Sequence, residues 1–328
     1  MKELEVEMFL KNMGQGASRP ALIICDDYQH YVIKNERVEI DGQTHKSDCM
    51  FVNELLAFQI GEFLDVPVPE SVIAIVNKET VESDPEVRFQ YKFEAGRFFA
   101  SKNLEQVENN ILDNFIKLRS MKKPFIKKSW NKFFQEVNNK EDIAKILAFD
   151  ILIANFDRYN NMGNILINLE GANKKIYAID HGHSFFGLFW NTNKIGCLKI
   201  ETITQEYIMS YSKGILETIT KNSPFSQWTI FGALQEHIDI EDENNHSFKD
   251  IVNRIKSLNE TMIEEWLDNI PEEWYVNKTK QKAYYINFLM KQKNIVENII
   301  QVLAENGAFT NYTGGVLRYE CTKKENTI

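Results

Sequence analysis

The sequence predicts an α+β protein of two lobes, with a β-rich lobe in residues 1–95 and a mainly helical lobe in residues 96–315. Before residue 95, about five short runs have strand patterns and only one run has helical spacing. Beyond residue 100, long runs carry apolar residues at helical spacing. Strand-rich and helix-rich parts that are separated along a chain are typical of α+β proteins. The polar residues 316–328 are predicted to form a loose tail.

The N-terminal elements follow from alternation and from apolar runs. Acidic and apolar residues alternate from Glu3 to Met8, which is the period of a half-buried strand. The runs ALIIC and HYVIK follow as two strands separated by the turn-forming DDY. Residues 48–64 have helical spacing and end before the prolines of DVPVPE. The runs SVIAIV and RFQYKF are predicted to be further strands, which places the lobe boundary near residues 91–96.

The C-terminal part is predicted to be helical apart from one hairpin. The runs NILIN and KIYAID flank a turn at Gly171 and read as two antiparallel strands. Helical spacing is present in residues 103–118, 129–154, 200–220, 247–268 and 279–305.

Composition and charge restrict the partners. A formal net charge of -9 argues against broad binding to nucleic acid or anionic membranes. The lysine-rich and aromatic stretch 122–134 is predicted to be an amphipathic segment rather than a docking site for an acidic partner or RNA. The four cysteines contain no CxxC pair, and the chain shows neither a signal-peptide pattern nor an apolar run of about 18 residues. We therefore expect a cytoplasmic protein that has no membrane partner.

Lys34 and Glu54 are the first candidate pair. Lys34 ends the strand run YVIK, where most lysines simply face water. Glu54 lies on the apolar stripe of the helical run, because the residues three and four positions away are apolar or small. A carboxylate buried there needs a partner, and Lys34 on the preceding strand is the candidate. Kinases use such a strand lysine and helix glutamate to hold the α- and β-phosphates of ATP.

The loop MGQGAS precedes the strand that leads towards Lys34. Gly14 and Gly16 would let the backbone approach a phosphate closely and point its N–H groups at it. A GxG sequence taken alone is more often an ordinary turn, so the prediction depends on its place before the lysine strand.

Three polar residues follow the helical run IAKILAFDILIA. Asp157 lies where the helix should give way to a loop, and it can accept a proton from a hydroxyl or orient that hydroxyl. Asn164 leads into one strand of the predicted hairpin, and Asp180 ends the other. An amide and a carboxylate on adjacent strand ends suit Mg²⁺. The alternative is that all three are turn residues. Asp150, within the helical run, is predicted to be buried and to brace the loop.

The stretch NFDRYNNMGNILI followed by YAIDHGHSF resembles the HipA-like serine/threonine kinases, which are relatives of the phosphatidylinositol-kinase and protein-kinase folds. The segments YVIK, VNELLAFQIGEFLDVPVPE and WLDNIPEEW extend the resemblance to residues 10–290. The resemblance implies a two-lobed protein-kinase-like fold, with ATP and Mg²⁺ as nucleotide and metal and a protein serine or threonine as acceptor. It also implies that Asp157 is the catalytic aspartate, that Asn164 and Asp180 bind Mg²⁺, and that Lys34 binds phosphate.

Further roles follow from the same resemblance. Ser18 falls in the phosphate-binding loop, where some family members autophosphorylate. Arg158 could stabilise charge on the transferring phosphoryl group or could pair with a carboxylate. We expect ATP between the lobes with its adenine against YKFEA, so Lys92 and Phe93 are candidate ATP contacts beside Glu54.

The sequence departs from the family pattern in the metal-binding loop. In many relatives the metal asparagine comes five residues after the catalytic aspartate, where this chain has Met162, and Asn164 comes at seven. Asn160 and Asn161 are the fallback ligands. The chain is also shorter than the toxin-type members, which have an additional N-terminal subdomain for antitoxin contact. A toxin role is therefore not implied, and an antitoxin-type partner is left open.

Two rival functions remain. One is a small-molecule or lipid kinase on the same fold, which no acceptor-binding motif excludes. The other is a non-catalytic interaction protein that keeps a nucleotide pocket. The presence of Lys34, Asp157 and Asp180 counts against the second, because a decayed kinase usually loses one of these residues.

Overall fold

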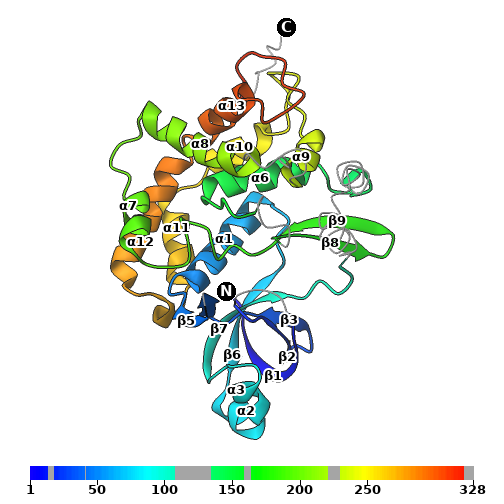
Figure 1. The fold of residues 1–328 in the computed structure, drawn as a ribbon, viewed down its shortest axis with the longest axis vertical. Helices are drawn as coiled ribbons and strands as arrows, with labels where there is room; N and C mark the ends of the chain where they lie inside the picture. Colours follow the sequence, from blue (N-terminus) through cyan, green and yellow to red (C-terminus); the bar gives the residue numbers. More distant parts are fainter. Residues whose placement is uncertain (14–17, 41, 108–133, 159–163, 221–229, 321–328) are drawn as a thin grey trace, which may run out of the picture.

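The computed structural model describes residues 1–13, 18–40, 42–107, 134–158, 164–220 and 230–320 (Figure 1). It has the predicted mixed α+β composition, with a β-rich N-terminal region and a helical C-terminal region. Five strands form a closed barrel in the order β1, β2, β3, β7, β6, and β6 pairs back onto β1: β1 (Glu3–Asn12), β2 (Ala21–Cys25), β3 (His30–Ile33), β6 (Ser71–Val76) and β7 (Gly96–Lys102).

The barrel is held by alternating apolar side chains. In β1, Leu4, Val6 and Phe9 are buried while the glutamates between them are exposed, as the sequence pattern predicts. The inward residues of the other strands join them in one cluster with Ile23 and Ile33. Closure of the sheet leaves no unpaired edge in the barrel.

Helix α1 (Met50–Leu64) lies between the barrel and the other helices (Figure 1). Because it is covered on both sides, almost all of its residues are buried, including the polar Asn53, Glu54 and Gln59. It ends at Asp65, whose left-handed backbone (φ 57) stops the helix shortly before the prolines. This location lets one helix contact both the barrel and the C-terminal region.

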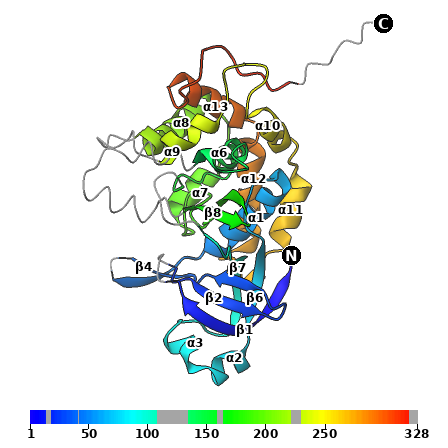
Figure 2. The ribbon, with the colours of Figure 1, turned by 90° about the vertical axis from the view of Figure 1, so that its right-hand side faces the viewer.

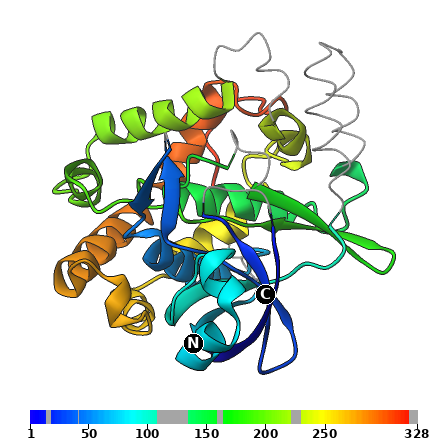
Figure 3. The ribbon, with the colours of Figure 1, turned by 60° about the horizontal axis from the view of Figure 1, so that its bottom comes forward.

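The C-terminal region contains most of the helices and one hairpin. Strands β8 (Ile165–Glu170) and β9 (Asn173–Ala178) pair antiparallel around Gly171, as predicted, and extend from the side of the molecule (Figures 1 and 3). Two of the runs predicted to be single helices are each divided into two helices, α10–α11 and α12–α13. The described helices are α6 (Asp142–Leu152), α7 (Thr192–Leu198), α8 (Gln205–Thr220), α9 (Ile230–Leu234), α10 (Lys249–Lys256), α11 (Glu260–Asp268), α12 (Lys278–Gln292) and α13 (Val296–Glu305), with 3₁₀ turns η3 (Gln235–His237) and η4 (Glu272–Trp274).

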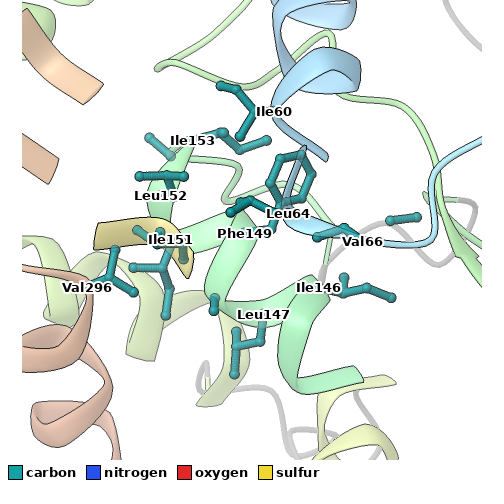
Figure 4. Packing of buried hydrophobic residues seen from close by; sticks show 14 of the residues in the cluster. Ile60, Leu64, Val66, Ile146, Leu147, Phe149, Ile151, Leu152, Ile153 and Val296 are labelled. Carbon is teal, nitrogen blue, oxygen red and sulfur yellow. The ribbon is translucent and has the colours of Figure 1, made fainter. Parts of the chain in front are cut away.

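The main hydrophobic core joins α1 to α6. Phe149 of α6 is fully buried and packs beside Ile60 and Leu64 of α1 (Figure 4). A Cβ added at Gly61 would meet the ring of Phe149 at 3.6 Å and Val68 at 3.2 Å, so the two helices approach closely at this glycine. Helix α6 is thereby fixed against α1, and the loop that follows α6 is placed relative to the barrel.

The prediction that RFQYKF forms a strand is wrong. Arg88 and Phe89 instead end helix α3 (Pro85–Phe89), and residues 90–93 form the turn and loop after it. Helix α3 and the preceding helix α2 (Lys78–Ser83) lie at the far end of the barrel (Figures 1 and 2). Asp84 caps α3 by accepting a hydrogen bond from the Glu86 backbone N–H, and Pro85 occupies the first helical position. The fifth barrel strand is β7. The sequence interpretation also missed a hairpin, β4 (Arg37–Ile40) and β5 (Gln43–Lys46), which turns at Gly42 (φ 75).

The expected loose tail does not begin at residue 316. Leu317 and Tyr319 are buried, and the Leu317 backbone N–H donates to Gln301 Oε1 at 3.0 Å. Within the part of the chain that the structure describes, no helix is both long enough and apolar enough to cross a membrane.

Candidate active site

Lys34 lies between two carboxylates. Its Nζ donates to Glu54 Oε1 at 2.5 Å and to Asp180 Oδ1 at 3.1 Å. The side chains of Lys34 and Glu54 are 12% and 2% exposed, whereas that of Asp180 is 43% exposed. The predicted pairing of Lys34 with Glu54 is therefore present, and the same lysine also reaches the predicted metal aspartate.

Each member of this group is positioned by a different element. Lys34 directly follows β3, and its backbone N–H donates to Phe99 of β7 at 3.0 Å. Glu54 belongs to α1 and accepts two further hydrogen bonds, from the backbone N–H groups of His181 at 3.1 Å and Gly182 at 3.0 Å. The Glu54 carboxylate therefore fixes both the lysine and the residues that follow Asp180.

The charges of the group shift its pKa values. Desolvation lowers the pKa of Lys34, but the charges of Asp180 and Glu54 raise it by more, so the ammonium remains protonated. Desolvation raises the pKa of Asp180, but Lys34 outweighs it and holds the value at about 2. Burial raises the pKa of Glu54, and the Lys34 charge offsets part of that shift. Burial, together with the charges of Arg158 and Lys34, lowers the pKa of His181 well below its ordinary value, which favours a neutral imidazole.

The hairpin β8–β9 brings the other predicted residues to the same place. The Ile179 backbone N–H donates to the Asn164 carbonyl at 3.1 Å, so Asn164 lies on the strand end beside Asp180. The Asn164 side-chain Nδ2 donates to Asp157 Oδ2 at 2.9 Å. Asp157 and Asn164 are therefore adjacent, and pairing of the two strands brings Asp180 alongside.

The oxygen atoms present fit a magnesium ion. Oδ1 of Asp180 contacts Lys34, which leaves Oδ2 for a cation, and no described residue donates to Oδ1 of Asn164. Asp180 has a left-handed backbone (φ 59), a conformation that non-glycine residues rarely adopt and that is concentrated at functional sites. A carboxylate and an amide oxygen, one of them partly exposed to water, are a donor set that suits Mg²⁺.

Arg158 pairs with a carboxylate. Its guanidinium is fully buried, and its Nε donates to Asp150 Oδ2 at 2.7 Å. Its Nη1 donates to the backbone carbonyls of Asn164 at 2.5 Å and Ile179 at 2.9 Å. Asp150 also accepts from Asn155 Nδ2 at 3.2 Å, so it braces the loop as predicted. Of the two roles expected for Arg158, these contacts favour the structural one.

Only part of the predicted phosphate-binding loop is described. The Asn35 backbone N–H donates to the Ser18 carbonyl at 3.2 Å, which places Ser18 beside the end of the lysine strand. Gly14 and Gly16 lie outside the described residues, as do Asn160, Asn161 and Met162 and nearly all of the lysine-rich stretch 122–134.

Phe93 lies inside the barrel core. Its ring is fully buried in the barrel core, 5.2 Å from Phe9 and 5.0 Å from Phe98 between ring centroids. The expectation that it binds ATP is therefore corrected, because an apolar ring enclosed by the barrel cannot reach an adenine. Lys92 lines a pocket of about 250 Å³ with Phe51 and Trp274, and none of Lys34, Asp157 and Asp180 lines that pocket.

Residues 103–107 form the connection that the sequence interpretation missed. They follow β7, where the Asn103 backbone N–H donates to the His30 carbonyl at 2.9 Å. At their other end, Val107 forms an isolated bridge with Asn168 of β8, and the Leu169 backbone N–H donates to Gln106 at 2.8 Å. The chain therefore passes from the barrel to the hairpin here rather than at YKFEA.

Comparison with known proteins gives one family. Residues 6–126 match the model of the HipA-like kinase family. The resemblance to this family is confirmed. The matched region contains Lys34 and Glu54, and Asp157, Asn164 and Asp180 lie beyond it. No curated protein matches the chain. Among solved structures, the chain is similar to the proinflammatory kinase CtkA of Helicobacter pylori, with 15% identity, a TM-score of 0.48, and coverage of 94% of this chain and 97% of that chain.

Proposed function

We propose that the protein is an ATP- and Mg²⁺-dependent kinase that transfers the γ-phosphoryl group to a serine or threonine hydroxyl of a protein. The observation that carries the proposal is the position of Lys34 between Glu54 and Asp180. Kinases require this lysine–glutamate pair and a metal-binding aspartate together. The family match supports kinase activity in general, and the acceptor class rests on the resemblance to HipA-like serine/threonine kinases.

Each residue of the candidate site would have a separate role in phosphoryl transfer. Lys34 would contact the α- and β-phosphates, where Glu54 keeps its ammonium in place. Asp157 would orient the acceptor hydroxyl and take its proton, and the Asn164 side chain fixes one carboxylate oxygen for this task. Asn164 and Asp180 would hold Mg²⁺, which would supply positive charge to neutralise the transferring phosphoryl group.

The proposal includes two lobes with a revised boundary. Because β7 closes the barrel, the N-terminal lobe would extend to Lys102 and the C-terminal lobe would begin after the connection 103–107. We place the adenine beside this connection, since it is the segment that joins the barrel to the hairpin carrying Asn164 and Asp180. Its backbone groups would supply the polar contacts that fix a flat base.

Calorimetric titration of ATP, with and without Mg²⁺, tests the nucleotide part of the proposal. We expect Mg²⁺-dependent binding by the wild type and at least about tenfold weaker binding by Asp180→Ala, the loss expected when a charge-assisted metal contact is removed. Asp250→Ala is the matched control, because Asp250 is an exposed aspartate on α10. Equal Mg²⁺ dependence in wild type and Asp180→Ala would exclude Asp180 as a metal ligand.

A further inference from the structure

Asn53 is a fully buried asparagine that ties α1 to the segment after the proposed metal aspartate, residues 180–188, here named the Asp180 segment. Its Nδ2 lies within hydrogen-bond distance of three backbone carbonyls of this segment. The acceptors are Gly182 at 2.6 Å, Ser184 at 2.9 Å and Gly187 at 3.0 Å. The two hydrogens of a single side-chain NH₂ group are therefore shared among three carbonyls of the segment.

The other side of the same amide is also held. Tyr285 of α12 donates its hydroxyl to Asn53 Oδ1 at 2.6 Å, and Lys194 of α7 donates to the same oxygen at 3.2 Å. The Lys194 ammonium also donates to the Gly187 carbonyl at 2.8 Å and lies 5.3 Å from the centre of the Tyr285 ring. Because Oδ1 faces two donors, the amide is locked with Nδ2 towards the Asp180 segment.

The segment lies close against α1. A Cβ at Gly182 would meet Met50 Cγ at 3.0 Å and Glu54 Oε1 at 3.4 Å. At the start of α1, the Cys49 backbone N–H donates to the Leu188 carbonyl at 2.9 Å. The segment is therefore fitted to α1 along its length, and Asn53 lies next to Glu54 on that helix.

We infer that Asn53 is a positioning residue that sets the Asp180 segment for metal binding, with Tyr285 and Lys194 fixing its amide. The inference rests on the proposed function, because it assigns the Asp180 carboxylate to Mg²⁺. Glu54 binds the start of the segment through the His181 and Gly182 N–H groups, and Asn53 binds the carbonyls of Gly182, Ser184 and Gly187. Two adjacent residues of α1 thus control both the lysine and the metal ligand.

A purely structural role would produce a loss of stability without a specific loss of metal binding. Gln59 provides the matched control, since it is a buried amide on the same helix whose Nε2 donates to the Leu55 and Trp266 carbonyls at 3.3 and 3.1 Å. Gln59→Met removes these bonds without altering any contact of the Asp180 segment. Substitutions at both positions should therefore lower the free energy of unfolding, and only those at Asn53 should alter the conformation of the Asp180 segment.

The test compares Asn53→Asp, Tyr285→Phe and Gln59→Met. Asn53→Asp keeps the oxygen that faces Tyr285 and Lys194 but replaces the donor to the three carbonyls with a second acceptor. Tyr285→Phe keeps the buried ring and removes the hydroxyl that donates the 2.6 Å bond to the amide, so it should fold. The two readouts are the Mg²⁺ concentration for half-maximal ATP binding and the hydrogen exchange of the backbone amides of residues 181–188.

We expect Asn53→Asp to raise the half-maximal Mg²⁺ concentration at least about tenfold, Tyr285→Phe about threefold, and Gln59→Met less than about twofold, on the scale of one buried hydrogen bond. Exchange in the segment should become faster in the same order. Wild-type Mg²⁺ dependence and exchange in Asn53→Asp, or in Tyr285→Phe if the first variant does not fold, would overturn the inference. An equal shift in Gln59→Met would do so as well. Absence of Mg²⁺-dependent binding in the wild type would instead refute the proposed function, and the exchange data would still show whether Asn53 holds the segment.

Discussion

The buried ion pair of Asp150 and Arg158 holds the loop that carries Asp157, and the free energy that it contributes to folding can be predicted. Both side chains are essentially inaccessible to water, with 2% and 0% exposure, and their Oδ2 and Nε atoms are 2.7 Å apart. Removal of one partner of a buried ion pair leaves an uncompensated charge, which costs about 3–5 kcal/mol. We therefore expect Asp150→Asn and Arg158→Met each to lower the free energy of unfolding by about that amount.

The double variant Asp150→Asn/Arg158→Met separates the ion pair from the other bonds. No uncompensated charge remains in it, but the Asn164 and Ile179 carbonyls lose their bonds from Arg158, and among the described residues the Asn164 carbonyl keeps only the bond from the Ile179 N–H. The double variant should therefore remain about 1–3 kcal/mol less stable than wild type. Urea denaturation of the four proteins gives these free energies. A double variant as unstable as the sum of the single variants would refute the ion-pair reasoning. Normal stability of Arg158→Met with loss of phosphoryl transfer would show that Arg158 acts on the phosphoryl group instead.

Three further predictions concern the site. Glu54→Gln should raise the KM for ATP at least about tenfold in steady-state kinetics, because Lys34 loses its buried partner; an unchanged KM would show that the pair does not position the lysine. Asn164→Ala should weaken Mg²⁺-dependent nucleotide binding and also slow transfer, since the side chain that fixes Asp157 is removed; unaltered kinetics would make Asn164 a turn residue. Burial lowers the pKa of Lys194 from 10.5 to about 8, so between these pH values the unfolded chain binds the proton that the folded chain has released. Wild-type stability measured by urea denaturation should therefore rise relative to Lys194→Met by up to about 1.4 kcal/mol per pH unit from pH 8 to 10, and a constant or falling difference would contradict the burial of a lowered-pKa lysine.

The elements predicted well from the sequence are those whose signals are local. The alternation from Glu3 to Met8 describes β1 closely, because one buried face imposes that period. The run of residues 48–64 describes α1 closely, because its length and the prolines after it indicate a helix even though the helix is buried on nearly all sides. The run RFQYKF was wrongly predicted to be a strand because its apolar residues alternate. The Asp84–Pro85 pair before it is a helix-start signal. Local alternation could not distinguish a strand from the end of a short helix and the loop after it.

The part of the candidate site that could be predicted consists of residues whose position in the sequence already indicates a chemical role. A glutamate on an apolar stripe requires a buried partner, which pointed from Glu54 to Lys34, and polar residues at strand ends pointed to Asn164 and Asp180. The role of Asn53 was not predictable, because its partners come from distant segments that only the folded chain brings together. The connection 103–107 was missed for the same reason, since it is defined by closure of the barrel.

We propose that Lys34, Asp157 and Asp180 form one phosphoryl-transfer site. Incubation with γ-labelled ATP and Mg²⁺, beside Asp157→Ala and the control Asp250→Ala, tests it most directly. We predict label on the wild type and the control, on themselves or on an added protein acceptor, and none with Asp157→Ala, although Asp157→Ala still binds ATP. Equal labelling by Asp157→Ala would remove Asp157 from the mechanism. A wild-type protein that neither binds ATP nor transfers labelled phosphate would contradict the proposed kinase function.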